Sequence, residues 1–228
     1  MTRVSANKYR IGLLGGSFNP VHIGHLRICV ECLENAGLDR IELIPCFLPP
    51  HKDNQGLLSF ELRQKMLEQA VQHVPGIKIN SLEKKRQGPS YTWDTLKRMS
   101  EQEPDSELFF ILGDNDLLTM DQWYQGRNIP GLSNLLVVER QQDLTSIARF
   151  IDHFWGFERI SPEKWDTGRN TRISYLKIPR LEISSSLIRA RWTAGRNVRW
   201  LVPEEVEAVL RDCSDQCLEA WTKEKAGP

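Results

Sequence analysis

The feature that most constrains the fold is an alternation of short apolar runs with amphipathic segments along most of the chain. The apolar runs have the length and composition of buried strands, and they occupy residues 11–14, 41–44, 77–79, 108–112, 135–138 and 173–178. Segments with helical periodicity lie between them, most clearly at residues 60–74 and 91–100. This pattern predicts an α/β fold, a Rossmann-like doubly wound parallel sheet with helices on both faces. Residues 141–172 are polar, aromatic and poorly periodic, and we expect a variable excursion there.

A glycine-rich turn follows the first predicted strand. Residues 15–25 read Gly-Gly-Ser-Phe-Asn-Pro-Val-His-Ile-Gly-His. Gly15 and Gly16 have no side chain, so a phosphate or a sugar can approach their backbone closely, and Ser17 adds a hydroxyl. A strand that passes through such a turn into a helix is typical of a nucleotide site.

The helix after this turn carries two histidines. Pro20 suits the entry to a helix that begins around Val21, which places His22 and His25 on one face of the first turn. Gly24 between them costs about 0.8–1.0 kcal/mol relative to Ala in a helix interior. A closely packed ligand would explain that choice, and we expect both imidazoles to face one anion.

A second polar cluster lies near the C-terminal end, where residues 183–189 read Ile-Ser-Ser-Ser-Leu-Ile-Arg. Three serines before an amphipathic run predict a helix N-cap and free hydroxyls. Arg189 would lie one turn into this helix, from where it can reach an oxyanion. Alone, the pattern indicates only a capped helix. Beside the glycine turn, we interpret it as the second wall of a polyphosphate site.

Composition limits the partners of the chain. Its 30 basic and 30 acidic residues leave no net charge, which gives no support to a general polyanion binder, so we expect no nucleic-acid partner. No run of 18 apolar residues occurs, and residues 1–10 lack the apolar core of a signal peptide. We therefore expect a cytoplasmic chain without a membrane partner. The composition indicates no oligomeric state.

The five cysteines do not form the pattern of a disulfide framework in a chain of 228 residues. Cys29 and Cys32 fall within the first predicted helix, and Cys213 and Cys217 lie one turn apart near the end. Because the two pairs are far apart in the sequence, we favour small apolar residues that stay reduced over a zinc or redox site. No residue is assigned to a metal.

The two polar motifs resemble those of the nucleotidyltransferase superfamily that shares its HxGH loop with class I aminoacyl-tRNA synthetases. Within it, four further segments are similar to the bacterial nicotinate mononucleotide adenylyltransferases: residues 49–52 (Pro-Pro-His-Lys), 90–96 (Ser-Tyr-Thr-Trp-Asp-Thr-Leu), 117–119 (Leu-Leu-Thr) and 123–124 (Trp-Tyr). The likeness extends over roughly residues 9–212 in the same order. It implies the nucleotidyltransferase type of Rossmann-like fold.

This resemblance also implies an activity, the transfer of AMP from ATP to nicotinate mononucleotide. The products would be nicotinate adenine dinucleotide and pyrophosphate, on the route to NAD, by direct in-line displacement with Mg²⁺ carried mainly by the ATP phosphates. The implied catalytic residues are His22, His25 and Arg189. The implied ATP-binding residues are Gly15, Gly16, Ser17, Phe18, Gly24, Ile183, Ser184, Ser185 and Ser186. The implied acceptor-binding residues are Lys52, Tyr91, Thr92, Trp123 and Asn115.

Two positions depart from the family pattern. Cys46 stands where the family usually has Asn, and Asn115 takes the place of the Asp in a Gly-x-Asp motif, with Asp114 and Asp116 beside it. If either change reshapes the acceptor pocket, pyridine selectivity would change before ATP binding does. Three alternatives stay open: a sibling phosphopantetheine adenylyltransferase or cytidylyltransferase, a class I tRNA synthetase, which the short chain disfavours, and a non-catalytic nucleotide sensor.

The chain shows no internal repeat, low-complexity tract or evident linker. We therefore expect one nucleotidyltransferase domain over residues 1–212, in which residues 184–212 form a C-terminal helical part. Residues 213–228 form a tail to which the sequence assigns no role; its end, residues 219–225, resembles a solvated helix end.

Overall fold

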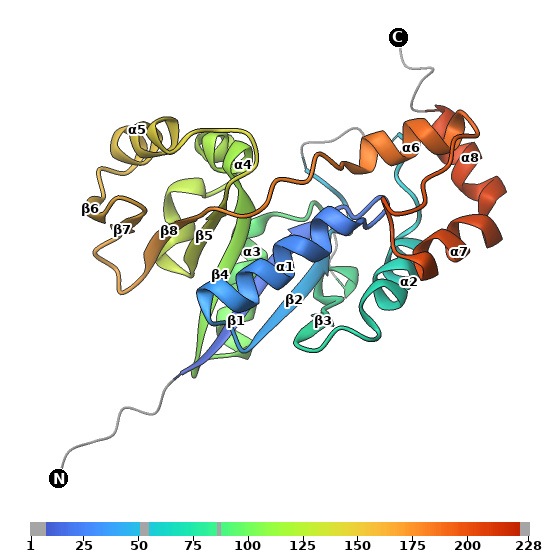
Figure 1. Cartoon of the computed structure of the whole chain (residues 1–228). Coiled ribbons are helices and arrows are strands. Elements are labelled where there is room, and N and C mark those ends of the chain that lie inside the picture. Colours follow the sequence, from blue (N-terminus) through green and yellow to red (C-terminus); the bar gives the residue numbers. More distant parts are fainter. Residues whose placement is uncertain (1–7, 51–54, 86–87, 224–228) are drawn as a thin grey trace.

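The computed structural model describes residues 8–50, 55–85 and 88–223. Within them, one sheet of eight strands has the order β3-β2-β1-β4-β5-β8-β7-β6 (Figure 1). The strands are β1 Tyr9–Gly16, β2 Arg40–Pro45, β3 Ile77–Ile79, β4 Ser106–Gly113, β5 Asn134–Val138, β6 Glu158–Ser161, β7 Lys164–Asp166 and β8 Arg172–Leu176. Each predicted apolar run lies in a strand, although the last strand ends at Leu176 rather than at residue 178. The predicted α/β class is confirmed.

The sheet is mostly parallel rather than wholly so. The pairs from β3 through β2, β1, β4 and β5 to β8 are parallel, whereas β7 is antiparallel to both β8 and β6. The two antiparallel strands come from residues 141–172, where an irregular excursion was expected. That segment also holds the helix α5, Leu144–Phe154. The strands were hard to see because β6 is largely exposed and Trp165 is the one fully buried residue of the short strand β7, whereas α5 has a regular apolar stripe (Ile147, Ile151 and Phe154) that the prediction overlooked.

Helices cover both faces of the sheet. The first face packs against α1 Ile23–Ala36, α2 Phe60–Val71, α6 Ser185–Thr193, α7 Glu204–Asp212 and α8 Ser214–Lys223. The second packs against α3 Thr92–Gln102, α4 Asp114–Leu118, α5 and the 3-10 helices η1 Leu82–Lys85, η2 Met120–Gln122 and η3 Gly126–Gly131. Figure 1 shows α1 across the near face, with α6, α7 and α8 gathered near α2. None of the helices in the described residues is long and apolar enough to span a bilayer.

Successive residues of the central strands face opposite cores. Ile11 and Leu13 of β1 pack into the second-face core, whereas Leu14 packs into the first, and Phe109 and Phe110 of β4 divide in the same way. A strand buried on both faces needs apolar residues at nearly every position, which is why β1 and β4 read as continuous apolar runs.

The C-terminal helix belongs to the first-face core. Cys217 and Trp221 of α8 are buried among residues of α7 and the sheet, although the expected domain ended at residue 212. Cys29 and Cys32 lie in the same core within α1, and burial raises the pKa of the Cys32 thiol to about 12. None of the five cysteines, all of which lie in the described residues, forms a disulfide.

The strand order locates the site. The chain runs from β1 outward to β2 and β3 and then returns to place β4 on the other side of β1. Ligands of such sheets bind at the carboxyl ends of the strands where the order reverses. The glycine turn leaves that end of β1, α4 leaves that end of β4, and residues 139–142 follow β5.

Candidate active site

The first helix begins two residues later than the sequence indicated. α1 starts at Ile23, and His22 is its N-cap residue with extended backbone, φ −148° and ψ 168°. The backbone N–H of His22 donates to Nδ1 of His25 at 3.3 Å. The His25 side chain therefore satisfies an amide at the start of α1 and keeps His22 outside the helix. The Ile23 N–H donates to the Leu201 carbonyl at 3.0 Å. Two backbone amides at the start of α1, those of His22 and Ile23, are thus bonded within the protein.

The two imidazoles do lie together. The ring centroids of His22 and His25 are 3.6 Å apart with planes at 25°, and the His25 ring also meets the edge of Phe18 at 5.0 Å. His22 is only 2% exposed. Burial, and then the charge of Arg140, lower the pKa of His22 to about 3, so this imidazole is neutral at pH 7. Its Nδ1 has no hydrogen-bond partner among the described residues.

Protein atoms, rather than a ligand, explain why residue 24 is a glycine. A Cβ at this position would lie 3.0 Å from Nδ1 of His22 and 3.6 Å from the Ile183 carbonyl oxygen. A Cβ would therefore press on the His22 ring, which would have to shift, whereas the Ile183 carbonyl lies at an ordinary van der Waals distance. We expected a closely packed ligand at Gly24; the structure shows close packing there by protein atoms.

The second polar motif contacts the first across 165 residues and more. Ser184 caps α6 by accepting from the Leu187 N–H at 3.1 Å, and the Ser185 hydroxyl donates to the Pro20 carbonyl at 2.9 Å. Arg189 donates from one guanidinium nitrogen to the Asn19 carbonyl and from another to Oγ of Ser186, both at 3.0 Å. The predicted cap and the meeting of the two motifs are present. The three hydroxyls each have a partner, so they are not free as expected.

Sequence reasoning missed Arg63, which is 1% exposed. Its guanidinium donates to the Ser17 carbonyl at 2.7 Å and to the Leu58 carbonyl at 3.0 Å. It thereby fixes the turn in which Phe18 takes a left-handed backbone, φ 45°, that is unusual for a bulky residue. The signal was available: Arg63 falls on the apolar stripe of its helix, three residues from Phe60 and four from Leu67.

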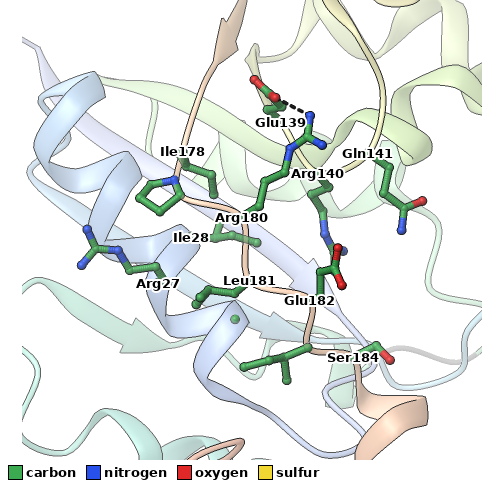
Figure 2. Close-up of a pocket in the computed structure, with 13 residues that line it drawn as sticks. Arg27, Ile28, Glu139, Arg140, Gln141, Ile178, Arg180, Leu181, Glu182 and Ser184 are labelled. Atoms are coloured by element: carbon green, nitrogen blue, oxygen red, sulfur yellow. Dashed lines mark hydrogen bonds and ion pairs between the residues drawn. The ribbon is translucent and has the colours of Figure 1, made fainter.

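A cleft of about 400 Å³ opens at the start of α1, where its lining includes Gly24 (Figure 2). Its walls are the start of α1, the loop after β5 and the segment between β8 and α6; the lining residues are Gly24, Arg27, Ile28, Glu139, Arg140, Gln141, Ile178, Pro179, Arg180, Leu181, Glu182, Ile183 and Ser184. Arg180 and Glu139 form an ion pair of 2.5 Å at one side. Three arginines and two glutamates line the cleft, and two of these arginines are already ion-paired, Arg180 with Glu139 and Arg27 with Glu31. Glu139, Arg140 and Gln141 were not expected, although their place at the carboxyl end of β5 was a usable signal.

Tyr91, Thr92 and Trp123, which were expected to bind the acceptor, lie with α3 and η2 on the second face of the sheet. Tyr91 is the N-cap residue of α3 and Thr92 its first residue. The Tyr91 ring lies 4.8 Å from that of Tyr124, and Nε1 of Trp123 donates to Oγ1 of Thr119 at 3.2 Å. Tyr91 and the Trp123 turn are thus brought together through Tyr124.

Asn115 links the two sides. Its Nδ2 donates to Oε1 of Gln141, and its Oδ1 accepts from Nε2 of Gln142, both at 2.8 Å. Cys46, the other departure from the family pattern, donates its backbone N–H to the Gly16 carbonyl at 2.9 Å. Lys52 lies outside the described residues.

The doubly wound sheet, with two helices starting against one polar cleft at the strand ends, defines an α/β nucleotide-binding protein. The sequence profile of the cytidylyltransferase-like family matches residues 13–191, and the chain belongs to this family. The "Probable nicotinate-nucleotide adenylyltransferase" of Trichlorobacter lovleyi is 37% identical over 211 residues, 88% of this chain and 96% of that protein. The protein of the same name from Maridesulfovibrio salexigens is 34% identical over 220 residues, 93% and 99% of the two chains. The chain is a nucleotidyltransferase of this group.

Solved structures agree on the fold. The nicotinic acid mononucleotide adenylyltransferase of Plasmodium falciparum, complexed with NaAD, superposes with a TM-score of 0.71 at 19% identity, over 92% of this chain and 98% of that one. The same enzyme complexed with APC gives 0.71 at 18% identity, over 91% and 97%. The nucleotidyltransferase type of fold that the resemblance implied is confirmed.

Proposed function

We propose that the protein transfers AMP from ATP to nicotinate mononucleotide and releases nicotinate adenine dinucleotide and pyrophosphate. The observation that carries this proposal is the junction of the two motifs, where Arg189 and Ser185 bind the carbonyls of Asn19 and Pro20 close to the buried His22 and the partly buried His25. The names of the relatives support the choice of acceptor over a phosphopantetheine or cytidine substrate.

ATP would bind across the starts of α1 and α6. The cleft lined by Gly24, Ile183 and Ser184 would take its nucleoside, and the triphosphate would extend to the glycine turn. His22 and Arg189 would contribute in different ways, so this part of the site is more than a cluster of cations. His22 is neutral and would donate one N–H to a phosphate oxygen, and Arg189 is the nearby fixed positive charge. A bound triphosphate would favour protonation of His22, which adds attraction as charge builds.

Nicotinate mononucleotide would bind on the side of α3 and the Trp123 turn. Trp123, with Tyr91 and Tyr124 nearby, offers flat faces for a pyridine ring. The amide at Thr92, the first residue of α3, lies at a helix start, which favours the pyridine carboxylate. Asn115 would bind the ribose while its amide stays bonded to Gln141 and Gln142.

The reaction needs no protein nucleophile. An ionised phosphate oxygen of the acceptor attacks the α-phosphorus of ATP, the bond from that phosphorus to the β-phosphate bridging oxygen breaks, and pyrophosphate leaves with that oxygen. The protein's contribution is to align the two phosphates and to stabilise the charge that develops, chiefly through His22, His25 and Arg189.

A divalent cation, Mg²⁺ by preference, would arrive with ATP. Among the described residues, no group of three or more His, Cys, Asp or Glu side chains could hold a metal ion. An ion coordinated mainly by phosphate oxygens and water fits such a site, because Mg²⁺ retains waters and takes few protein ligands. It would neutralise charge on the phosphates during the transfer. Chelation of the cation should abolish turnover, and added Mg²⁺ should restore it.

The direct test is pyrophosphate release from ATP and nicotinate mononucleotide, with product identity checked by mass. Nicotinamide mononucleotide, phosphopantetheine and CTP serve as matched alternative substrates. We expect the highest kcat/KM for nicotinate mononucleotide with ATP. No release above background at millimolar concentrations would leave ATP binding without turnover, as in a nucleotide sensor, and would overturn the proposal.

A further inference from the structure

The loop after β5 is held by one buried carboxylate. Asp114, the first residue of α4, is fully buried, and its Oδ2 accepts from three consecutive backbone N–H groups: Arg140 at 2.8 Å, Gln141 at 2.8 Å and Gln142 at 2.7 Å. Its Oδ1 accepts from the Asn115 N–H at 2.7 Å. Successive amides that converge in this way form an anion-binding nest, which here is filled by the chain's own carboxylate.

The loop held in this way forms one wall of the cleft. The Arg140 side chain extends from it toward Glu182 in the segment between β8 and α6, as Figure 2 shows, and Gln141 also lines the cleft while its Oε1 accepts from Asn115. Two further contacts limit the freedom of the loop. The Tyr175 hydroxyl donates to the Gln142 carbonyl at 3.1 Å, and a Cβ on Gly113 would lie 3.1 Å from Cδ of Arg140, so the stem of Arg140 packs directly on the backbone before α4.

We propose that Asp114 is a positioning residue for the nucleotide-donor side: it fixes the 140–142 backbone so that Arg140 and Gln141 meet the bound ATP. This inference rests on the proposed function, because it assigns the cleft to ATP. Neither direct contact with substrate nor chemistry is assigned to Asp114, which is covered by the loop it binds. Arg140 also acts on the charge of His22, so its position affects both the cleft wall and the histidine pair.

A carboxylate suits this role better than a neutral group. Three N–H dipoles point at one oxygen, and hydrogen bonds to a charged acceptor are roughly twice as strong as neutral ones. Removal of the acceptor leaves three partly buried donors without this partner, so the loop is no longer held and can turn its N–H groups toward water or other partners. The side chains that it carries into the cleft then move with it.

The experiment compares Asp114→Ala and Asp114→Asn with Asp105→Asn. Asp105 is exposed in the turn at the opposite end of the same strand, so the control loses an equal charge away from the cleft. ATP binding is measured by calorimetry, and KM is measured for both substrates. For Asp114→Ala we expect the ATP Kd and KM to rise about tenfold, since a misplacement near 1 Å is sufficient for such losses. The acceptor KM should rise clearly less, because the acceptor would meet the displaced loop only through Asn115.

Asp114→Asn separates positioning from folding. Its amide keeps one oxygen for the nest, so the rise in ATP KM should be a few-fold, between those of the wild type and the Ala variant. Arg140→Ala, measured alone and combined with Asp114→Ala, completes a double-mutant cycle. The double variant should lose much less ATP affinity than the sum of the two single losses.

Two results would overturn the inference. One is an unchanged ATP affinity together with a lower melting temperature, which assigns Asp114 to the scaffold only. The other is an equal rise in KM for both substrates. If Asp114→Ala does not fold, the Asn variant provides the same comparison. If the wild type binds ATP but forms no dinucleotide, the proposed function fails while calorimetry with ATP still decides the role of Asp114.

Discussion

The donor and acceptor sides of the site are built from contacts of different range. On the donor side, Arg189 binds the carbonyl of Asn19, 170 positions away, and Arg63 binds that of Ser17, 46 positions away. On the acceptor side, Trp123 is bonded to Thr119 within one turn of chain. The longer acceptor-side contacts, Tyr91 with Tyr124 and Asn115 with Gln141, span 33 and 26 positions, so this side depends on shorter-range contacts than the donor side. We therefore expect pyridine selectivity to change there with less effect on ATP binding.

The largest effect should come from breaking the donor side at His25. We expect His25→Ala to lower kcat by about 10²–10³-fold while the ATP Kd changes less than about threefold, because loss of one preorganised donor costs about 3–4 kcal/mol of barrier. Rapid-quench turnover and calorimetry measure the two quantities. His22→Ala should behave alike.

His73→Ala is the matched control, since His73 is exposed at the end of α2, away from the cleft. It should retain wild-type turnover. An unaltered kcat in both His22→Ala and His25→Ala would remove the histidines from the chemistry.

The next largest effect should follow from Arg63, which holds the donor-side turn from below. Arg63→Met keeps much of the buried volume but leaves the Ser17 and Leu58 carbonyls without this donor, at about 1–3 kcal/mol for each unsatisfied group. We expect the free energy of unfolding, measured in urea, to fall by about 2–3 kcal/mol. The kcat/KM for ATP should fall more than the kcat/KM for the acceptor.

Arg63→Lys sharpens this test. A lysine keeps the charge, yet its single ammonium cannot reproduce a guanidinium that spans two carbonyls. Partial stability with a persistent loss in ATP kinetics would agree with a role in shaping the turn. Equal losses for both substrates would point to a general core defect instead.

A smaller effect concerns pH, again on the donor side. The pKa of His22 is about 3 in the folded protein, against the ordinary histidine value of 6.5 that applies once the chain is unfolded. Below pH 6.5 the unfolded chain takes up a proton that the folded protein refuses, so stability is lost as pH falls from 6.5 toward 3. Between pH 7.5 and pH 5 the titration of His22 should lower the free energy of unfolding by about 2 kcal/mol.

His22→Asn removes this titration and keeps a residue that favours the N-cap position. The wild type should therefore lose about 2 kcal/mol more than the variant over that interval in urea unfolding. His73→Asn, at an exposed site, should keep the wild-type dependence. Identical acid sensitivity in all three proteins would contradict a buried, neutral His22.

The difference in range also explains what the sequence could predict. The strands, the Ser184 cap and the meeting of the two motifs follow from apolar periodicity and residue type, and each is present. The start of α1 was misplaced because a side chain three residues on, His25, occupies the amide of His22. The apolar stripe of α2 and the end of β5 mark the places of Arg63 and Arg140, but their partners, the Ser17 carbonyl and the Asp114 carboxylate, become evident only where distant segments meet. The antiparallel strands β6 and β7 were missed because few of their residues are buried.

The smallest expected effect sharpens the comparison from the acceptor side. Trp123→Ala should raise the KM for nicotinate mononucleotide about tenfold, because stacking of a base on an aromatic ring is worth about 1–3 kcal/mol, and it should leave the ATP Kd nearly unchanged. Trp123→Phe keeps a flat face and should recover most of the loss. Trp155→Ala, in the aromatic cluster at the end of α5, controls for removal of an indole elsewhere. Because Trp123 also packs on Phe110, equal weakening of both ligands would mean that the two sides are coupled through the core. The acceptor side would then be no more local than the donor side.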